Sequence, residues 1–127
     1  MSNCRFCSLL DHRILEQDAL TMIMRDRYPV SLGHTLVIPK RHIASFFEAT
    51  EEEQAALWAA LHRARAGLDA EHSPDGYNIG INDGMAAGQT VMHLHIHLIP
   101  RYLDDSDDPR GGVRWIFPDK AKYWVGP

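Results

Sequence analysis

Three histidines alternate with apolar residues in one short stretch, and this alternation constrains the local structure more than any other feature of the chain. Residues 93–99 read His-Leu-His-Ile-His-Leu-Ile. Side chains of a β-strand point alternately to the two faces of its sheet. The sequence therefore predicts His93, His95 and His97 on one face, and the apolar residues between them on the other. The apolar face can join a core, while the imidazole face lines a surface or a cleft.

Three roles are open for this imidazole face. A metal site is one, because imidazole is the commonest neutral ligand, although a flat strand rarely presents three ligands to one ion. A structural role is another, but three histidines in strict alternation make it less fitting than a lone histidine would. Catalysis is the favoured role, because a neutral imidazole can attack phosphorus or a carbonyl carbon while its neighbours orient it and handle protons. A metal role for one of the three stays open.

Polar residues upstream of the histidines favour phosphate chemistry. Gly88, Gln89 and Thr90 supply a close backbone approach, an amide and a hydroxyl. Asn82 ends the preceding apolar stretch on the same side of the intervening loop. Donors that converge near a nucleophilic imidazole suit an oxyanion on phosphorus. Each of these residues alone is an ordinary loop residue, and only their clustering indicates a site.

The remaining pattern predicts an α+β fold with one long helix. Thr50 and Glu53 form a capping-box signature, and apolar residues then recur at helical spacing, which predicts a helix over residues 51–71. Apolar, β-branched stretches predict four strands, joined in antiparallel hairpins with the helix on one face. These strands are expected over residues 19–24, 34–38, 77–82 and 91–100.

Composition limits the classes of partner. The 127 residues suit one domain spanning residues 1–127, and the formal net charge is -4. A negative net charge argues against electrostatic binding of a nucleic acid polymer or an anionic membrane over a broad surface. It does not exclude a local phosphate site. No apolar stretch has the length of a spanning helix, and residues 1–7 lack the apolar core of a signal peptide. A cytoplasmic protein is expected.

The two ends of the chain carry further signals. Cys4 and Cys7 are three residues apart and fit a metal half-site, a redox pair or two small apolar residues. Residues 103–127 contain an acidic loop at 104–108 and a tail rich in aromatic residues. So many aromatics indicate that the tail packs on the domain or on a partner subunit. The remaining histidines, His12, His62 and His72, carry no predicted role.

The chain resembles the histidine-triad (HIT) family of nucleotide hydrolases and transferases. Residues 93–99 fit the family pattern His-φ-His-φ-His-φ-φ, in which φ is apolar. Residues 33–42, Gly-His-Thr-Leu-Val-Ile-Pro-Lys-Arg-His, resemble the family's upstream strand. The resemblance extends over most of the chain, from Cys4 to about Arg101. It implies an antiparallel sheet that continues across a homodimer.

The resemblance also implies roles for the histidines. His95 would attack the α-phosphorus of a nucleotide and form a nucleotidyl-histidine, which water would then hydrolyse. His97 would contact the phosphate or the leaving-group oxygen. His93 would sit beside the nucleophile, and His34 would orient the triad. No organic cofactor is expected.

Substrate contacts follow from the same resemblance. Asp26 falls at the position of the ribose contact, with a simple turn acid as the alternative. Asn82, Gly88, Gln89 and Thr90 fall at phosphate contacts, and Thr90 keeps the hydroxyl of the serine that is frequent there. Some members of the family also carry a structural zinc site.

In this sequence the corresponding zinc ligands are Cys4, Cys7, His42 and His93. Two thiolates and two imidazoles make a closed tetrahedral site. In the metal-free alternative, His42 is a surface residue.

Two substrate branches are consistent with the resemblance. One splits dinucleoside polyphosphates and the other releases amines from nucleoside phosphoramidates. Ile99-Pro100-Arg101 favours the polyphosphate branch. A nucleotide-binding module without catalysis, or a metal-binding regulatory protein, is the alternative from another class.

Overall fold

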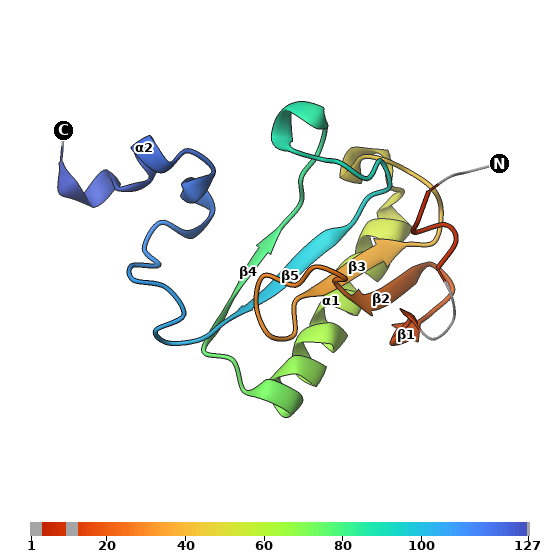
Figure 1. The fold of residues 1–127 in the computed structure, drawn as a ribbon. Coiled ribbons are helices and arrows are strands. Elements are labelled where there is room, and N and C mark those ends of the chain that lie inside the picture. The colour runs from red at the N-terminus through yellow and green to blue at the C-terminus, as the bar shows by residue number, and fades with distance from the viewer. Residues whose placement is uncertain (1–3, 10–12, 127) are drawn as a thin grey trace.

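A five-stranded antiparallel sheet forms the centre of the protein, and one long helix lies across one of its faces (Figure 1). The computed structural model describes residues 4–9 and 13–126, so His12 lies outside the described residues. The strand order is β1-β2-β3-β5-β4, and every neighbouring pair is antiparallel. The predicted α+β class is confirmed. The strands are β1 (Glu16–Gln17), β2 (Thr21–Arg25), β3 (Thr35–Pro39), β4 (Gly76–Gly80) and β5 (Ile96–Arg101).

The first hairpin is the predicted one, with an additional short strand at its outer edge. Strands β2 and β3 pair from Thr21 opposite Pro39 to Arg25 opposite Thr35. The two residues of β1 pair with β2 and were not predicted. Both of their side chains are exposed, so this strand leaves no apolar alternation in the sequence.

The histidine strand is shorter than predicted. The sequence predicts a strand over residues 91–100, whereas β5 begins at Ile96. Before that point the Leu94 N–H donates to the Ile43 carbonyl outside the ladder. The Pro39 carbonyl at the end of β3 accepts a hydrogen bond from Nε2 of the His93 ring. The pairing of this segment with β3 therefore begins only at Ile96, and the prediction of a strand from 91 to 95 is wrong.

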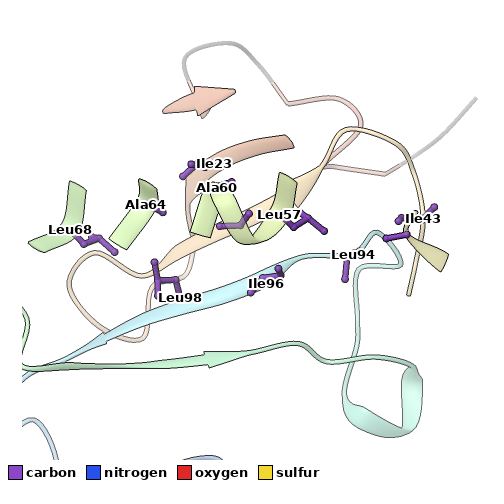
Figure 2. Close-up of a cluster of buried hydrophobic side chains, with 11 residues drawn as sticks. Ile23, Ile43, Leu57, Ala60, Ala64, Leu68, Leu94, Ile96 and Leu98 are labelled. Carbon is purple, nitrogen blue, oxygen red and sulfur yellow. The ribbon is translucent and has the colours of Figure 1, made fainter. Parts of the chain in front are cut away.

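The alternation of faces nevertheless persists through this irregular segment. Leu94, Ile96 and Leu98 are almost wholly buried and join the core beneath the helix (Figure 2). His93 and His95 both lie against Phe6, in the layer on the other face of the sheet. The core residues therefore fix which way the histidines point.

Helix α1 (Glu51–His72) begins and ends close to the predicted residues. The Thr50 hydroxyl accepts the Glu53 N–H, and the Glu53 carboxylate accepts the Thr50 N–H, which confirms the capping box. Glu53 is buried and also receives two hydrogen bonds from Arg41, at 2.7 and 3.0 Å. The Arg41 guanidinium holds the pKa of Glu53 at about 2. This ion pair ties the segment after β3 to the start of the helix.

Two apolar clusters sandwich the sheet. The first lies between α1 and the sheet, and its labelled members in Figure 2 point toward one another from the helix and the strands. The second lies on the opposite face and combines strand residues with the N-terminal segment. Its buried members are Phe6, Met22, Met24, Leu36 and Ile38.

The C-terminal segment lies beyond the β4 edge of the sheet (Figure 1). It contains α2 (Pro118–Ala121) between two 3-10 helices, Gly112–Ile116 and Tyr123–Val125. Ala121 is buried, whereas Phe117 and Tyr123 remain largely exposed. The tail therefore has an ordered path but leaves much of its apolar surface uncovered.

The acidic loop is held by hydrogen bonds. Arg101 donates two bonds to the Asp105 carboxylate, and the Tyr102 N–H donates to the same group. Asp108 receives three hydrogen bonds from Arg110. In the described residues, 4–9 and 13–126, no helix combines the length and the apolar character needed to cross a membrane.

Candidate active site

A pocket opens on the face of the sheet opposite α1 and brings most of the predicted site residues together. Its volume is about 540 Å³, within the range of small-molecule sites. The catalytic candidates His34, His95 and His97 line it, together with Asp26. The predicted phosphate contacts that line it are Asn82, Gly88 and Thr90.

His95 is fixed in one tautomer by the backbone beside it. Its Nδ1 lies 2.8 Å from the His93 carbonyl oxygen. Because a carbonyl only accepts, Nδ1 carries the proton and donates it. In the neutral ring Nε2 then has a free lone pair, and the ring lines the pocket. A nucleophilic nitrogen is the chemical consequence.

His97 is fixed in the opposite tautomer, with its proton on Nε2, through a chain of hydrogen bonds from Val30 and His34. The Val30 N–H donates to Nδ1 of His34 over 3.1 Å, so neutral His34 carries its proton on Nε2. That nitrogen lies 2.9 Å from Nδ1 of His97 and donates to it. Neutral His97 therefore carries its own proton on Nε2. Side by side, with ring centroids 5.1 Å apart, His95 offers a lone pair and His97 offers an N–H.

Burial favours the neutral forms of His34 and His97. It lowers the pKa of His97 to about 4, and the neighbouring rings of His95 and His34 act in the same direction. Burial also lowers the pKa of His34, although the Asp26 carboxylate opposes it. The relay of hydrogen bonds requires neutral rings near pH 7, because a protonated imidazole has no lone pair with which to accept a hydrogen bond.

Asp26 is a turn acid that also lies beside the rings of His34 and His97. One carboxylate oxygen accepts the Tyr28 N–H at 2.8 Å, as a turn acid does. The other lies 3.4 Å from Nε2 of His34 and 4.0 Å from Nδ1 of His97. The carboxylate is mostly buried at the pocket wall. It is thus placed beside the imidazole relay, and the ribose contact remains a prediction.

Gln89 is placed differently from the other predicted phosphate contacts. Its buried side chain accepts the Gly84 N–H at 2.8 Å and donates to the carbonyls of Ala44 at 2.9 Å and Val91 at 3.1 Å. It is not among the residues that line the pocket. The structure therefore shows Gln89 as an anchor of the loop that carries Gly88 and Thr90.

His93 points away from the pocket toward a cluster of metal-binding side chains. Its Nε2 lies 2.8 Å from the Pro39 carbonyl and donates to it, which leaves Nδ1 without a proton. That nitrogen lies 3.1 Å from Nδ1 of His42, 3.4 Å from Sγ of Cys4 and 3.5 Å from Sγ of Cys7. All four predicted zinc ligands meet here.

These distances fit a tetrahedral zinc ion. Zinc bonds of about 2.0–2.1 Å to nitrogen and 2.3 Å to sulfur give ligand-to-ligand edges of roughly 3.3–3.7 Å in a tetrahedron. The distances from Nδ1 of His93 to the two sulfur atoms, 3.4 and 3.5 Å, fall in this range, and the two distances to Nδ1 of His42, 3.1 Å each, are slightly shorter. Two thiols and two imidazoles are also a usual donor set for structural zinc. Four protein ligands leave no open position for substrate.

Asp26, His34 and His97 also come within metal-binding distance of one another. The hydrogen-bond chain argues against a metal there, because Nε2 of His34 carries a proton and has no lone pair to offer. This group is better described as a relay that orients His97.

Sequence reasoning missed Phe6 and three arginines. Phe6, between the two cysteines, packs edge-on against His95 with ring centroids 5.1 Å apart, and it lines the pocket. Arg5, Arg13 and Arg27 line the pocket as well. The position of Phe6 within the Cys-x-x-Cys segment was a usable signal, because that segment must approach His93 to bind a metal. The arginines carry no motif.

Comparison with known proteins gives a consistent result. A family model described as the HIT domain matches residues 9–104. Protein Hit of Bacillus subtilis is 38% identical over 104 residues, covering 79% of this chain and 72% of its own. A HIT family protein from Bacillus anthracis superposes with a TM-score of 0.74 at 39% identity, covering 81% of this chain and 76% of the other.

Other similar proteins have informative names. A zinc-bound histidine triad family protein from Mycobacterium smegmatis superposes with a TM-score of 0.72 at 38% identity, covering 84% and 80% of the two chains. Bis(5'-adenosyl)-triphosphatase of Dictyostelium discoideum is 44% identical over 80 residues, which are 63% of this chain and 54% of that protein. Adenylylsulfatase HINT3 of Arabidopsis thaliana is 32% identical over 104 residues, 79% of this chain and 53% of that protein.

Proposed function

The chain belongs to the HIT domain family, and on that premise we propose that it cleaves nucleotides at the α-phosphorus through a covalent nucleotidyl-histidine on His95. The observation that carries the proposal is the Nδ1–H bond from His95 to the His93 carbonyl. That bond leaves Nε2 as an unprotonated nitrogen on a ring that lines the pocket.

In the first step Nε2 of His95 forms a bond to the α-phosphorus, and the bond from phosphorus to the leaving group breaks. The leaving group takes the electron pair of that bond. The His95 ring becomes positively charged as it is nucleotidylated. Its Nδ1–H bond to the His93 carbonyl then becomes a charge-assisted hydrogen bond, which stabilises the intermediate.

His97 supports the same step from the side. Its Nε2–H donates a hydrogen bond to the phosphate or to the leaving-group oxygen, where negative charge increases. His34 keeps this N–H in place by donating to Nδ1 of His97. The two residues thus act as an orienting pair, with only His97 touching the substrate.

The other pocket residues hold the nucleotide. Asn82, Gly88 and Thr90 line the pocket and supply donors for phosphate oxygens. Asp26 accepts hydrogen bonds from the ribose hydroxyls. Phe6 and Leu36 offer apolar surface for the base. Water then attacks phosphorus and gives up a proton to the solvent, the electron pair of the bond from phosphorus to Nε2 returns to the His95 ring, and the mononucleotide leaves.

Dinucleoside polyphosphates or related nucleotides are the proposed substrates. The names of the Dictyostelium and Arabidopsis relatives, a triphosphatase and an adenylylsulfatase, support substrates in which a nucleotide is joined to a second acidic group. A nucleoside phosphoramidase is the alternative. A module that binds nucleotides without cleaving them is the alternative from another class.

A structural zinc ion bound by Cys4, Cys7, His42 and His93 belongs to the proposal. When bound, the ion cross-links the N-terminal segment to the histidine segment. The fit of the four ligand atoms to a tetrahedron supports it. Zinc analysis of protein purified without added metal tests it, and a content far below one ion per chain would remove it.

We also propose a cytoplasmic homodimer in which the sheets meet at β4. This strand is at an edge of the sheet, and Ile79 within it is half exposed. Unpaired strand edges favour pairing with another strand. Sedimentation equilibrium should give twice the chain mass, and a monomer at micromolar concentration would contradict the dimer.

A turnover panel tests the activity. Wild-type protein is incubated with diadenosine triphosphate, adenosine 5'-phosphoramidate and a nucleotide sugar, and mononucleotide release is followed. His95→Ala should abolish release, whereas His62→Ala, at an exposed histidine on α1, should leave it unchanged. Binding without release by the wild type would favour the non-catalytic module. Full turnover by His95→Ala would exclude His95 as the nucleophile.

A further inference from the structure

Most arginines of this protein are already neutralised by a carboxylate. Of the ten arginines in the sequence, Arg114 donates to the backbone carbonyls of Lys120 and Ala121. Six others form ion pairs with aspartate or glutamate: Arg25, Arg41, Arg63, Arg65, Arg101 and Arg110. The three that remain are Arg5, Arg13 and Arg27.

These three arginines share one location. All of them line the pocket that holds His95 and His97. Within residues 4–9 and 13–126, no carboxylate forms an ion pair with any of them. They come from separate segments: one precedes Phe6, one follows the N-terminal turn, and one follows Asp26. Three of the four arginines without a carboxylate partner among the described residues therefore lie at the pocket, and the fourth, Arg114, is held by backbone carbonyls.

The pocket consequently differs in charge from the molecule as a whole. Among the described residues that line it, Asp26 is the one acidic residue, so three arginines against one aspartate give these residues a formal charge of +2. The whole chain carries -4. A positive concavity in a negative protein concentrates anionic ligands and raises their association rate.

The position of Arg101 sharpens the contrast. The sequence cue for the polyphosphate branch was the run after the triad, Ile99-Pro100-Arg101, which ends at this residue. In the structure its guanidinium is occupied by Asp105 and Asn78, and it does not line the pocket. The charge available to a substrate comes instead from three arginines that no motif indicated.

We propose that Arg5, Arg13 and Arg27 make this pocket select nucleotides with several negative charges, so that dinucleoside polyphosphates are preferred over phosphoramidates with an uncharged leaving group. This inference rests on the proposed function and names its substrate class. A phosphoramidate brings one charged phosphate, whereas a polyphosphate chain brings a charge at each phosphate. Charges act over the Debye length of about 10 Å at 0.1 M salt, which is on the scale of such a pocket.

The expected size of the effect is moderate. Arg5 and Arg27 are exposed and Arg13 is half-buried. A solvated charge pair contributes at most about fivefold in affinity. Loss of all three should therefore weaken polyphosphate binding by roughly 3- to 100-fold and should barely affect a singly charged ligand.

Equilibrium binding to an inactive protein tests the proposal. In the His95→Ala background, dissociation constants are measured for diadenosine triphosphate, diadenosine pentaphosphate and adenosine 5'-phosphoramidate at several salt concentrations. The pocket variant carries Arg5→Gln, Arg13→Gln and Arg27→Gln. A matched control carries the same change of net charge outside the pocket, through Arg65→Gln, Arg110→Gln and Lys120→Gln.

The proposal predicts that affinity increases with the number of phosphates and falls with salt. The pocket variant should lose this dependence, and the matched control should keep it. Equal weakening of all three ligands, or an unchanged salt dependence, would overturn the proposal. The single variant Arg27→Gln, at an exposed position, should show a smaller loss in the same direction if the triple variant is poorly folded.

This outcome is separable from the proposed function, because the binding assay needs no turnover. If affinity does not depend on the number of phosphates but the wild type still releases nucleotide, only the selection by charge is overturned. Charge-dependent binding without any release by the wild type would overturn the proposed reaction and leave the anion selectivity standing.

Discussion

Replacing Gln89 by leucine separates a direct substrate contact from a structural anchor. The side chain makes three hydrogen bonds to backbone groups, with Gly84, Ala44 and Val91, and it is buried. A typical hydrogen bond contributes about 0.5–1.5 kcal/mol net. Gln89→Leu should therefore lower the free energy of unfolding by about 1.5–4.5 kcal/mol. Leucine keeps a similar volume, so the loss reports mainly the bonds.

Urea unfolding followed by tryptophan fluorescence measures this loss, with two glutamine controls. Gln17 is exposed in β1, and Gln17→Leu should change stability by less than about 0.5 kcal/mol. Gln54 makes one hydrogen bond, to the Ala49 carbonyl, so Gln54→Leu should give an intermediate loss. If Gln89→Leu is as stable as Gln17→Leu while nucleotide affinity drops, Gln89 contacts the substrate and the anchoring role is refuted.

Three further predictions address the relay, the metal and the pH response. His34→Ala removes the donor to His97, so the turnover number should fall at least tenfold with little change in the affinity for AMP; equal losses in both would argue against an orienting role. Cys7→Ser should reduce bound zinc in elemental analysis and lower the melting temperature, whereas an unchanged zinc content would contradict a four-ligand site. The pKa of His97 is about 4 in the folded protein, against an ordinary value of 6.5. Between these pH values the unfolded chain binds more protons than the folded protein does. His97 should therefore contribute to a loss of stability as the pH falls from 6.5 toward 4. His97→Phe should weaken that dependence in urea titrations, and an identical dependence would contradict the assignment.

Regular periodicity made much of the fold predictable. The capping box at Thr50 and Glu53 placed the start of α1 correctly, and the apolar alternation placed the core face of the histidine segment. These signals are local, since they depend on residues close in sequence and on a repeat of fixed period. The start of the histidine strand at Ile96 was not predictable, because the residues before it bond to distant groups, as the His93 ring does to the Pro39 carbonyl 54 positions away.

The same distinction between local signals and long-range contacts holds for the candidate site. Motif spacing brought His34, His95 and His97 into one pocket, and it brought Cys4 and His42 to His93. The contacts of Gln89 could not be foreseen, because its three partners are backbone groups that only the folded loop brings to it. Arg5, Arg13 and Arg27 were missed because only the structure tells which arginines already have carboxylate partners. The net charge at a site depends on which charged residues have no ion-pair partner in the folded chain, and this cannot be read from the sequence.

The most direct test of the central claim is the identity of the residue that becomes nucleotidylated during turnover. Wild-type protein is mixed with diadenosine triphosphate, quenched under denaturing alkaline conditions that preserve a phosphoramidate bond, digested and analysed by tandem mass spectrometry. The proposed mechanism predicts an adenylyl group on His95, present also in His62→Ala and absent from His95→Ala. An adenylyl group on another residue, or steady-state turnover without any adduct on His95, would contradict it.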